Sequence, residues 1–439
     1  MKLNKNTYEN LEKIYDKNSS NKLIENAISN VGLREASLNK KIINKHDFIF
    51  SNEIKTGDVT DQKKTGRCWM FAGLNMVRMH IAKKLNMEDF ELSESYLYFY
   101  DNMEKANLFL QKIIDSKDLD LKDRKVEDIF YSTPDDGGYF EFFYYLIKKY
   151  GIVPKKVMGE IYHTKSSAFM FYTLEKALKK IAMEIRKTDN KEKIEDLRLK
   201  GLSYAYNIFA KAIGKPVRNF DFKYYDKDDN YHIIKNMTPK KFFDKYIGDF
   251  FDTKIKLLND PRHPYGRVLI DKVAKNATDL KDLEGVNVSM DTMSAIAQKS
   301  IENQETMWFA CDVDINEDRE SGVLDEKIFN LDQTFTNFPK MTKAERIDTR
   351  FSTACHAINL TGFDRKDEKV GFWKIENSWG DDDGNDGYFS MSDDWFRENT
   401  FEVIVDKKFV DDEILKAFDR EKIIYDEFDP IYKMLRNIK

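Results

Sequence analysis

The sequence lacks any apolar run long enough to cross a membrane. A spanning helix needs roughly 20 mostly apolar residues, and nothing close to that length occurs here. The opening stretch MKLNKNTYENLEKIYDKNSS has neither an apolar core nor a small-residue cleavage site, so it does not resemble a secretory signal. We therefore expect no membrane partner.

Cysteine is scarce, since only Cys68, Cys311 and Cys355 occur in 439 residues. An odd and sparse set argues against a disulfide framework and indicates a reducing compartment. The expected location is the cytoplasm.

A strong charge of one sign is also missing. The net charge is −5 and the isoelectric point is about 5.9, so there is no global attraction to nucleic acid, and we do not expect it as a partner. Hydrophobic residues make up 41% and charged residues 34%, which is typical of a folded globular protein. The length exceeds what one hydrophobic core usually supports, so we expect several substructures.

Helical periodicity dominates the first part of the chain. From Cys68, apolar residues recur at steps of three and four, which predicts an amphipathic helix toward Lys84. A second helix follows Ser93, and a third begins after the turn PDDGG and stops at Gly151. Residues 160–303 are rich in lysine and mostly helical in pattern, with loops at YYDKDDNY and LNDPRHPYG.

The pattern changes from residue 304. The stretches MWFACDVD, HAINLTGFD, VGFWKIENSWG and DGYFSMS are short, aromatic and β-branched, and Asp/Gly turns separate them. This is typical of an antiparallel sheet. The predicted fold class is therefore α+β, with a helical lobe, an antiparallel β-rich lobe and a large helical insertion. The expected division is 1–60, an N-terminal arm and the start of the β-rich lobe; 61–159, the helical lobe; 160–303, the insertion; 304–410, the β-rich lobe; and 411–439, a C-terminal arm.

Cys68 is a candidate nucleophile. Gly66 permits a turn just before it, and the predicted helix would place the thiol in its first turn. Backbone N–H groups there favour an anion, so we expect the thiol pKa to be lowered.

Partners for such a thiol occur later in the chain. His356 begins a predicted strand, and Asn377 ends the next one, where its amide oxygen would accept a hydrogen bond from the His356 Nδ1–H group. Trp379 would shield that bond from water. Gln62, six residues before Cys68, would place an amide N–H beside the Cys68 backbone N–H to receive an oxyanion.

Each residue taken alone has an ordinary interpretation. A lone cysteine at a helix start is more often a small buried hydrophobe, a lone histidine on a strand is more often a core group, and NSWG is compatible with a simple turn. The combination supplies every role in the right chain order, and this indicates catalysis.

The order of these residues resembles the papain-like cysteine peptidases. The interval between Cys68 and His356 is about twice the roughly 130 to 150 residues typical there, and the excess matches the lysine-rich insertion. Within that superfamily, GRCW, IENSWG, DGYFSMS, DDWF, FELSESYLYFYD, WFACDVD, KAERID and FEVIVDKKFV are similar to motifs of the bleomycin hydrolase and aminopeptidase C family. The likeness covers nearly the whole chain.

The resemblance implies a two-lobed peptidase with its cleft between the lobes. It further implies homo-hexamers, cytosolic cleavage of peptides, usually of single N-terminal residues, and incidental hydrolysis of bleomycin, without a metal or organic cofactor. The Cys-His-Asn set would act through an acyl-enzyme. The first interpretation of Gly137 and Gly138 is a turn. In such folds, however, glycines near this point let the substrate backbone approach closely. Gly137, Gly138 and Trp379 are therefore candidate substrate-binding residues.

The chain end departs from the family. Relatives carry a short tail of small residues whose terminal carboxylate binds the substrate amine, whereas IYKMLRNIK follows Pro430 here. Lys439 would supply that carboxylate, but Lys433, Arg436 and Lys439 would repel an ammonium group. An endopeptidase with an altered arm therefore stays open. So does a ring-forming binding protein with a vestigial site.

The other thiols have simpler interpretations. We expect Cys311 to be a buried strand residue and Cys355 to pack in the core, on the opposite strand face from His356. The remaining histidines are scattered without ligand spacing, so no metal site is expected.

Overall fold

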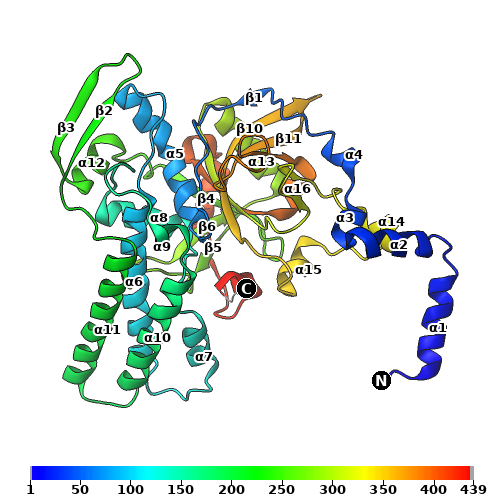
Figure 1. Ribbon diagram of the computed structural model, residues 1–439, viewed down its shortest axis with the longest axis horizontal. Coiled ribbons are helices and arrows are strands. Elements are labelled where there is room, and N and C mark those ends of the chain that lie inside the picture. Colours follow the sequence, from blue (N-terminus) through cyan, green and yellow to red (C-terminus); the bar gives the residue numbers. More distant parts are fainter. Residues whose placement is uncertain (1, 436–439) are drawn as a thin grey trace.

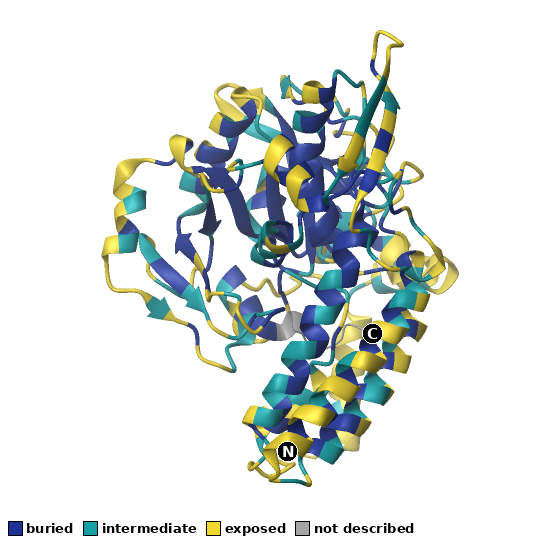
Figure 2. Ribbon diagram, turned by 90° about the vertical axis from the view of Figure 1, so that its left-hand side faces the viewer, coloured by how far each residue is buried: buried dark blue, intermediate teal, exposed yellow. Residues whose placement is uncertain are grey.

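Two hydrophobic cores organise the fold, one in a helical half and one around a sheet (Figure 1). The computed structural model describes residues 2–435, with side chains up to Tyr432. Figure 2 shows that buried residues concentrate in the sheet and in the helices against it. This arrangement confirms the α+β class predicted from the change in hydrophobic period.

The first core lies among the helices that follow Cys68. Within the described residues these are α5 (Cys68–Leu85), α6 (Glu94–Asp115), α7 (Arg124–Tyr131), α8 (Phe140–Tyr150), α9 (Tyr162–Lys165), α10 (Ala168–Ile185), α11 (Lys191–Ala212) and α12 (Pro239–Tyr246). The predicted helix starts are confirmed: α6 is capped by Ser93, whose hydroxyl accepts from the Tyr96 N–H at 3.1 Å. The predicted stop at Gly151 is confirmed by its φ of +77° at the end of α8.

Helix α5 is buried on nearly every side rather than amphipathic. Its expected apolar face is buried, but so are Trp69, Phe71 and Met76 on other faces. The reason is its position, because α5 packs on α8 and α6 and also on strands of the sheet. The helix carrying Cys68 is therefore held between the two halves.

A single mixed sheet forms the second half. Within the described chain it has twelve strands, ordered β14-β5-β6-β4-β13-β7-β10-β11-β12-β9-β8, with β1 paired to β10. The strands are β1 (Asn52–Glu53), β4 (Lys254–Leu258), β5 (Arg267–Asp271), β6 (Leu283–Asn287), β7 (Met307–Cys311), β8 (Glu317–Asp318), β9 (Val323–Leu324), β10 (His356–Lys366), β11 (Lys369–Glu376), β12 (Tyr388–Ser392), β13 (Thr400–Asp406) and β14 (Ile423–Ile424). The helices beside it are α13 (Met290–Glu302), α14 (Leu331–Phe335), α15 (Lys343–Asp348) and α16 (Asp393–Asn399).

The strands predicted near the candidate site are confirmed. Strand β10 pairs antiparallel with β7 and β11, and β11 pairs antiparallel with β12. Alternate residues of β7 face different cores: Trp308 and Ala310 belong to the helical core, while Phe309 and Cys311 belong to the core on the other face. The prediction that Cys311 is a buried strand residue is confirmed.

The expectation of a helical insertion over residues 160–303 is wrong for its second half. After α9 to α12 and a hairpin of β2 (Phe220–Tyr225) and β3 (Tyr231–Met237), strands β4, β5 and β6 extend the main sheet through β13. These runs are five residues long and each contains at least one charged residue, so their extended pattern was not recognised within a lysine-rich region. The predicted loop LNDPRHPYG joins β4 to β5, and YYDKDDNY forms the tip of the hairpin.

Both arms contain short elements. The N-terminal arm has α1 (Lys5–Asp16), α2 (Asn21–Val31), α3 (Leu33–Ser37) and α4 (Lys40–Ile43), and Figure 1 shows α1 standing away from the body. The C-terminal part has η1 (Lys407–Phe409), α17 (Asp412–Leu415), η2 (Lys416–Asp419), β14 and η3 (Pro430–Leu435). Among the described residues, no helix combines the length and apolar character that a membrane crossing requires.

Candidate active site

The turn before Cys68 is held by a carboxylate from the PDDGG segment. The Gly66 N–H donates to Asp136 Oδ2 at 3.0 Å, and the Trp69 indole donates to the Asp136 carbonyl at 2.8 Å. A Cβ on Gly66 would lie 2.9 Å from the Asp136 Cβ, so glycine is needed for this close approach. Asp136 is a positioning residue that the sequence analysis missed, although PDDGG was recognised there as a turn.

A buried ion pair holds the same turn from the other side. Arg67 is fully buried, and its guanidinium donates to both carboxylate oxygens of Glu160, at 2.9 and 3.3 Å. Burial alone would raise the pKa of Glu160, but Arg67 outweighs it and the pKa is lowered. The pair ties the nucleophile turn to the segment leading into α9.

Burial decides the protonation of Cys68. The side chain is about 9% exposed, and burial raises the pKa of its thiol to about 11, despite hydrogen bonds from the Ala357 and Trp69 backbone N–H groups. The prediction that the helix start lowers this pKa is therefore wrong for the resting site. Desolvation of the sulfur raises the thiol pKa by more than the helix N-terminus lowers it.

His356 and Asn377 meet as predicted, but through the other ring nitrogen. His356 Nε2 lies 2.8 Å from Asn377 Oδ1, which also accepts the Ser378 N–H at 2.8 Å. The expectation that Nδ1–H makes this bond is wrong. Nδ1 is therefore the ring nitrogen that stays available for proton transfer with another group. Trp379 stacks on the imidazole with ring centroids 4.8 Å apart, in the shielding position predicted for it.

The imidazole rests neutral. Burial lowers the pKa of His356 to about 4, although the hydrogen bond with Asn377 raises it. Cys68 and His356 line the same cavity, where a neutral imidazole can accept the proton of a neutral thiol, and this would produce the charged pair only when the sulfur attacks.

Gln62 lies buried next to this pair. Its amide oxygen accepts from Ser378 Oγ at 2.6 Å, and its Nε2 donates to the Thr65 carbonyl at 2.6 Å. Because Nε2 carries two N–H groups, one stays available to an oxyanion. The Gln62 backbone N–H also donates to the Ser378 carbonyl at 2.8 Å, which joins the two halves at the site.

One cavity of about 720 Å³ brings most of the predicted residues together. Among its lining residues are Gln62, Cys68, Gly137, Gly138 and His356, and the walls come from both halves of the molecule. Gly138 packs so closely on the Trp69 ring that a Cβ would lie 2.4 Å from it.

Two predicted substrate-binding residues are not placed in the cavity wall. Within the part of the chain that is described, Trp379 contacts His356 without being among the residues that line the cavity. Lys439 lies outside the described residues.

Cys355 packs against the core around the sheet, as expected. It directly precedes β10. The residue is partly exposed and lines the cavity.

A second buried ion pair lies behind the site, which sequence reasoning also missed. Arg78 of α5 donates to Glu376 Oε1 at 3.1 Å, and Asn75 donates to the same oxygen at 3.0 Å. Glu376 directly precedes Asn377, and both partners of the ion pair are about 1% exposed. Burial raises the pKa of Glu376 to about 7, against the opposing charge of Arg78. No local signal distinguishes these residues from ordinary helix and strand positions.

Comparisons with known proteins give matches over nearly the whole chain. The sequence model of the Peptidase C1-like family matches residues 2–432. Aminopeptidase C of Lactobacillus delbrueckii subsp. lactis is 38% identical over 403 residues, 90% of each chain. Aminopeptidase C of Listeria monocytogenes is 35% identical over 426 residues, 96% of this chain and 97% of that relative. The crystal structure of PepW from Lactobacillus rhamnosis has a TM-score of 0.94 at 34% identity and covers 98% of both chains.

Proposed function

The chain belongs to the Peptidase C1-like family and is a cysteine peptidase, and from this premise we propose that it is an aminopeptidase with Cys68 as nucleophile. The observation that carries the proposal is the cavity lined by both the buried thiol at the start of α5 and the imidazole at the start of β10. The relatives named above as aminopeptidases support the exopeptidase assignment.

The proposed reaction uses the residues in fixed roles. The Cys68 sulfur attacks the scissile carbonyl carbon while its proton passes to His356 Nδ1. The oxyanion receives hydrogen bonds from the Cys68 backbone N–H and from the Gln62 N–H group that Thr65 leaves unused. His356 then protonates the amine as the C–N bond breaks, and later takes a proton from the water that hydrolyses the thioester. Asn377 holds the imidazole in orientation throughout.

The C-terminal arm supports cleavage near a free N-terminus. The Ile431 carbonyl accepts from Thr353 Oγ1 at 3.3 Å, and Asp429 accepts from Arg262 at 2.9 Å. Ile431 and Tyr432 line a depression that shares Tyr139, Ala354 and Glu402 with the active-site cavity. We infer that the arm closes one end of the cleft and limits how far a peptide extends beyond the scissile bond.

Cleavage of one peptide with a free or an acetylated N-terminus tests this assignment. The full chain should cleave the free form, and a form truncated after Pro430 should lose that preference, because the residues that close the depression are gone. The catalytic control is Cys68→Ala, which should cleave neither peptide. Equal cleavage of both peptides by the full chain would contradict the aminopeptidase assignment and indicate an endopeptidase.

Assembly and location form the rest of the proposal. Helix α1 has no buried residue and exposes Leu11, Ile14 and Tyr15, which suits a helix that packs on another subunit. Together with the family resemblance, this supports a homo-hexamer in the cytoplasm. Light scattering of the full chain and of a form starting at residue 18 tests the assembly. The full chain should form particles of six subunits. The same number of subunits in both forms would show that α1 is not part of the contact.

A further inference from the structure

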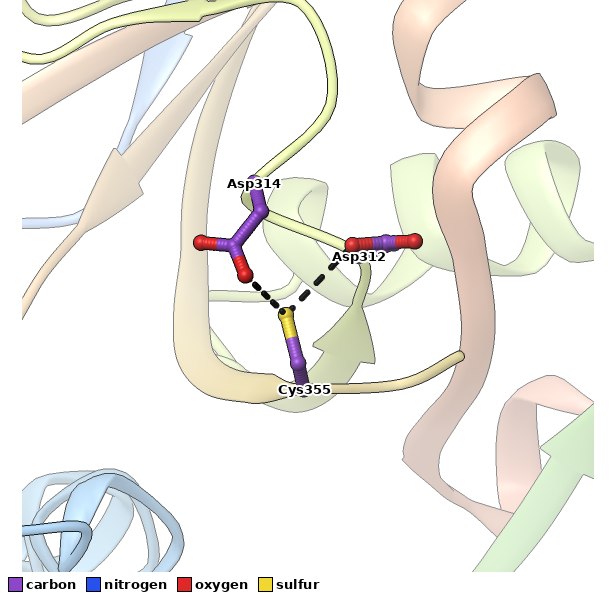
Figure 3. Close-up of side chains that lie close together, drawn as sticks. All are labelled: Asp312, Asp314 and Cys355. Atoms are coloured by element: carbon purple, nitrogen blue, oxygen red, sulfur yellow. Dashed lines mark hydrogen bonds between the residues drawn. The ribbon is translucent and has the colours of Figure 1, made fainter. Parts of the chain in front are cut away.

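Three potential metal ligands meet beside the active-site cavity. Asp312 and Asp314 follow strand β7, and Cys355 precedes β10, so the antiparallel pairing of the two strands brings them together (Figure 3). The Cys355 sulfur lies 3.5 Å from Asp312 Oδ1 and 3.7 Å from Asp314 Oδ2. All three ligand atoms lie within 4.8 Å of one another.

These separations match the edges of a tetrahedral zinc site. With Zn–S near ~2.3 Å and Zn–O near ~2.0 Å, a tetrahedral angle places sulfur and oxygen about 3.5 Å apart. Both measured sulfur–oxygen distances are close to this value. An ion bound to the sulfur would therefore fit either sulfur–oxygen edge, and the two oxygens lie within 4.8 Å of each other.

The charges in the cluster are not balanced by neighbouring cations. Within the described residues, neither Asp312 nor Asp314 forms an ion pair with a lysine, arginine or histidine. A thiol has a single proton to donate, so it cannot satisfy both carboxylates, whereas a divalent cation contacts both of them and the sulfur at once.

Asp312 is oriented as a metal ligand would be. Its other oxygen, Oδ2, accepts from Ser352 Oγ at 2.6 Å and from the Thr353 N–H at 3.2 Å, which leaves Oδ1 directed at Cys355. Hydrogen bonds to the second oxygen fix a ligating carboxylate in this way. Asp312 is buried while Asp314 is exposed, so an ion has access from solvent.

We propose that Cys355, Asp312 and Asp314 form a three-ligand site for a thiophilic divalent cation of the Zn²⁺ type, with the fourth position open to water. The two carboxylates and the thiolate bind the ion, and the thiol proton leaves to solvent.

Occupancy of this site lowers turnover. Cys355 is adjacent to His356 and lines the same cavity, so an ion bound there, together with the water in its open position, occupies cavity space beside the residue that acts on the substrate. This consequence rests on the proposed function, but binding of the ion does not.

Cation binding is tested in the Cys68→Ala background, which removes the other accessible thiol in the cavity. Cobalt(II) is the probe, because tetrahedral thiolate coordination gives it intense absorption bands that the hexaaqua ion lacks. The expected result is one equivalent bound with these bands, complete loss of the bands in Cys68→Ala/Cys355→Ser, and binding weakened by about 10-fold or more in Cys68→Ala/Asp314→Asn.

The matched control is Asp367→Asn in the same background, an exposed carboxylate at the far end of β10. It should leave the bands and the affinity unchanged. Absence of tetrahedral bands in the Cys68→Ala protein, or their survival after Cys355→Ser, would overturn the site.

The effect on turnover is measured with Cys68 present. Zinc also binds thiol peptidases at the catalytic pair, so the comparison is between Asp314→Asn and Asp367→Asn under rising Zn²⁺. The inhibitory concentration should rise about 10-fold or more only for Asp314→Asn. Equal inhibition of the two variants would show that zinc acts at Cys68 and His356. It would contradict a regulatory role for the site at Cys355.

Discussion

The two sides of the cleft are built by different means. On the nucleophile side, residues 62–67 have no regular structure, and Lys63 even adopts a φ of +53°. Side chains hold this turn: Asp136 binds the Gly66 N–H, and Glu160 pairs with Arg67. On the histidine side, β10 pairs with β7 from His356 to Leu360 and with β11 from Asn359 to Lys366, so His356 needs one hydrogen bond and one aromatic contact.

The difference shows where orientation comes from. A strand in the middle of a sheet fixes a side chain through backbone hydrogen bonds, whereas an irregular turn depends on the side chains around it. Substitutions around the nucleophile turn should therefore reduce activity or stability more than substitutions around the imidazole do.

The largest effect should come from the nucleophile itself. Cys68→Ala removes the attacking sulfur, and turnover should fall by about 10⁵-fold or more with the fold unchanged. Activity assays with circular dichroism as a fold check measure this, and mass mapping after iodoacetamide treatment identifies the labelled thiol. Cys311→Ala is the control, since Cys311 faces the other core and should be dispensable. Turnover in Cys68→Ala would contradict its role.

The next effect concerns the oxyanion. Gln62→Ala should lower kcat by about 10² to 10³-fold, the loss typical of one oxyanion donor. Gln62→Glu keeps an oxygen for Ser378 but has no N–H to donate, so it should lose at least as much as Gln62→Ala. If Gln62→Glu retained normal kcat, the contribution of Gln62 would be structural.

Breaking the charged support of the turn should reduce stability. Glu160→Gln leaves Arg67 buried without an opposite charge, which should lower the free energy of unfolding by about 3 kcal/mol. Because the folded pKa of Glu160 is lowered, its stabilisation is present above the unfolded carboxyl pKa of about 4.3 and is lost as pH falls through the folded pKa. The difference from wild type should therefore shrink in acid.

Urea unfolding at several pH values measures this difference. Glu195→Gln is the control, since that carboxylate is exposed and pairs only with Arg198 on its own helix. A Glu160→Gln protein as stable as wild type near neutral pH would show that the turn does not depend on this pair.

The smallest effect should come from the histidine side. Asn377→Ala removes the hydrogen bond to His356, worth about 1 kcal/mol, so kcat should fall about 5-fold. Wild-type kcat/KM should decrease as pH falls through about 4, where burial sets the pKa of His356. Since the bond to Asn377 raises this pKa, its loss should move the acid limb to lower pH.

A pH profile of kcat/KM for wild type, Asn377→Ala and the exposed control Asn385→Ala measures both effects. An unchanged acid limb in Asn377→Ala would mean that another group sets the protonation of His356. A loss larger than that of Gln62→Ala would reverse the ranking of the two sides.

Local patterns were sufficient for the elements that carry the site. The helix beginning at Cys68 and the strands beginning at His356 and ending before Asn377 follow from hydrophobic period and turn residues, and all three are confirmed. Strands β4 to β6 were missed, because five-residue runs that each contain charged residues have a weak period of their own. They become strands by pairing with each other and, through β4, with β13, a partner distant in the chain.

The sequence by itself determined which chemical groups are present, their order, and the helix and strands on which Cys68, His356 and Asn377 are carried. Only the tertiary structure decided their state: burial raises the pKa of the thiol and lowers that of the imidazole, and the fold brings Nε2 of His356 to Asn377. It also joined Arg67 to Glu160 and Cys355 to Asp312 and Asp314. The physical reason is range, since hydrophobic period is a property of neighbours in the chain, while desolvation and charge pairing depend on residues that only folding brings together.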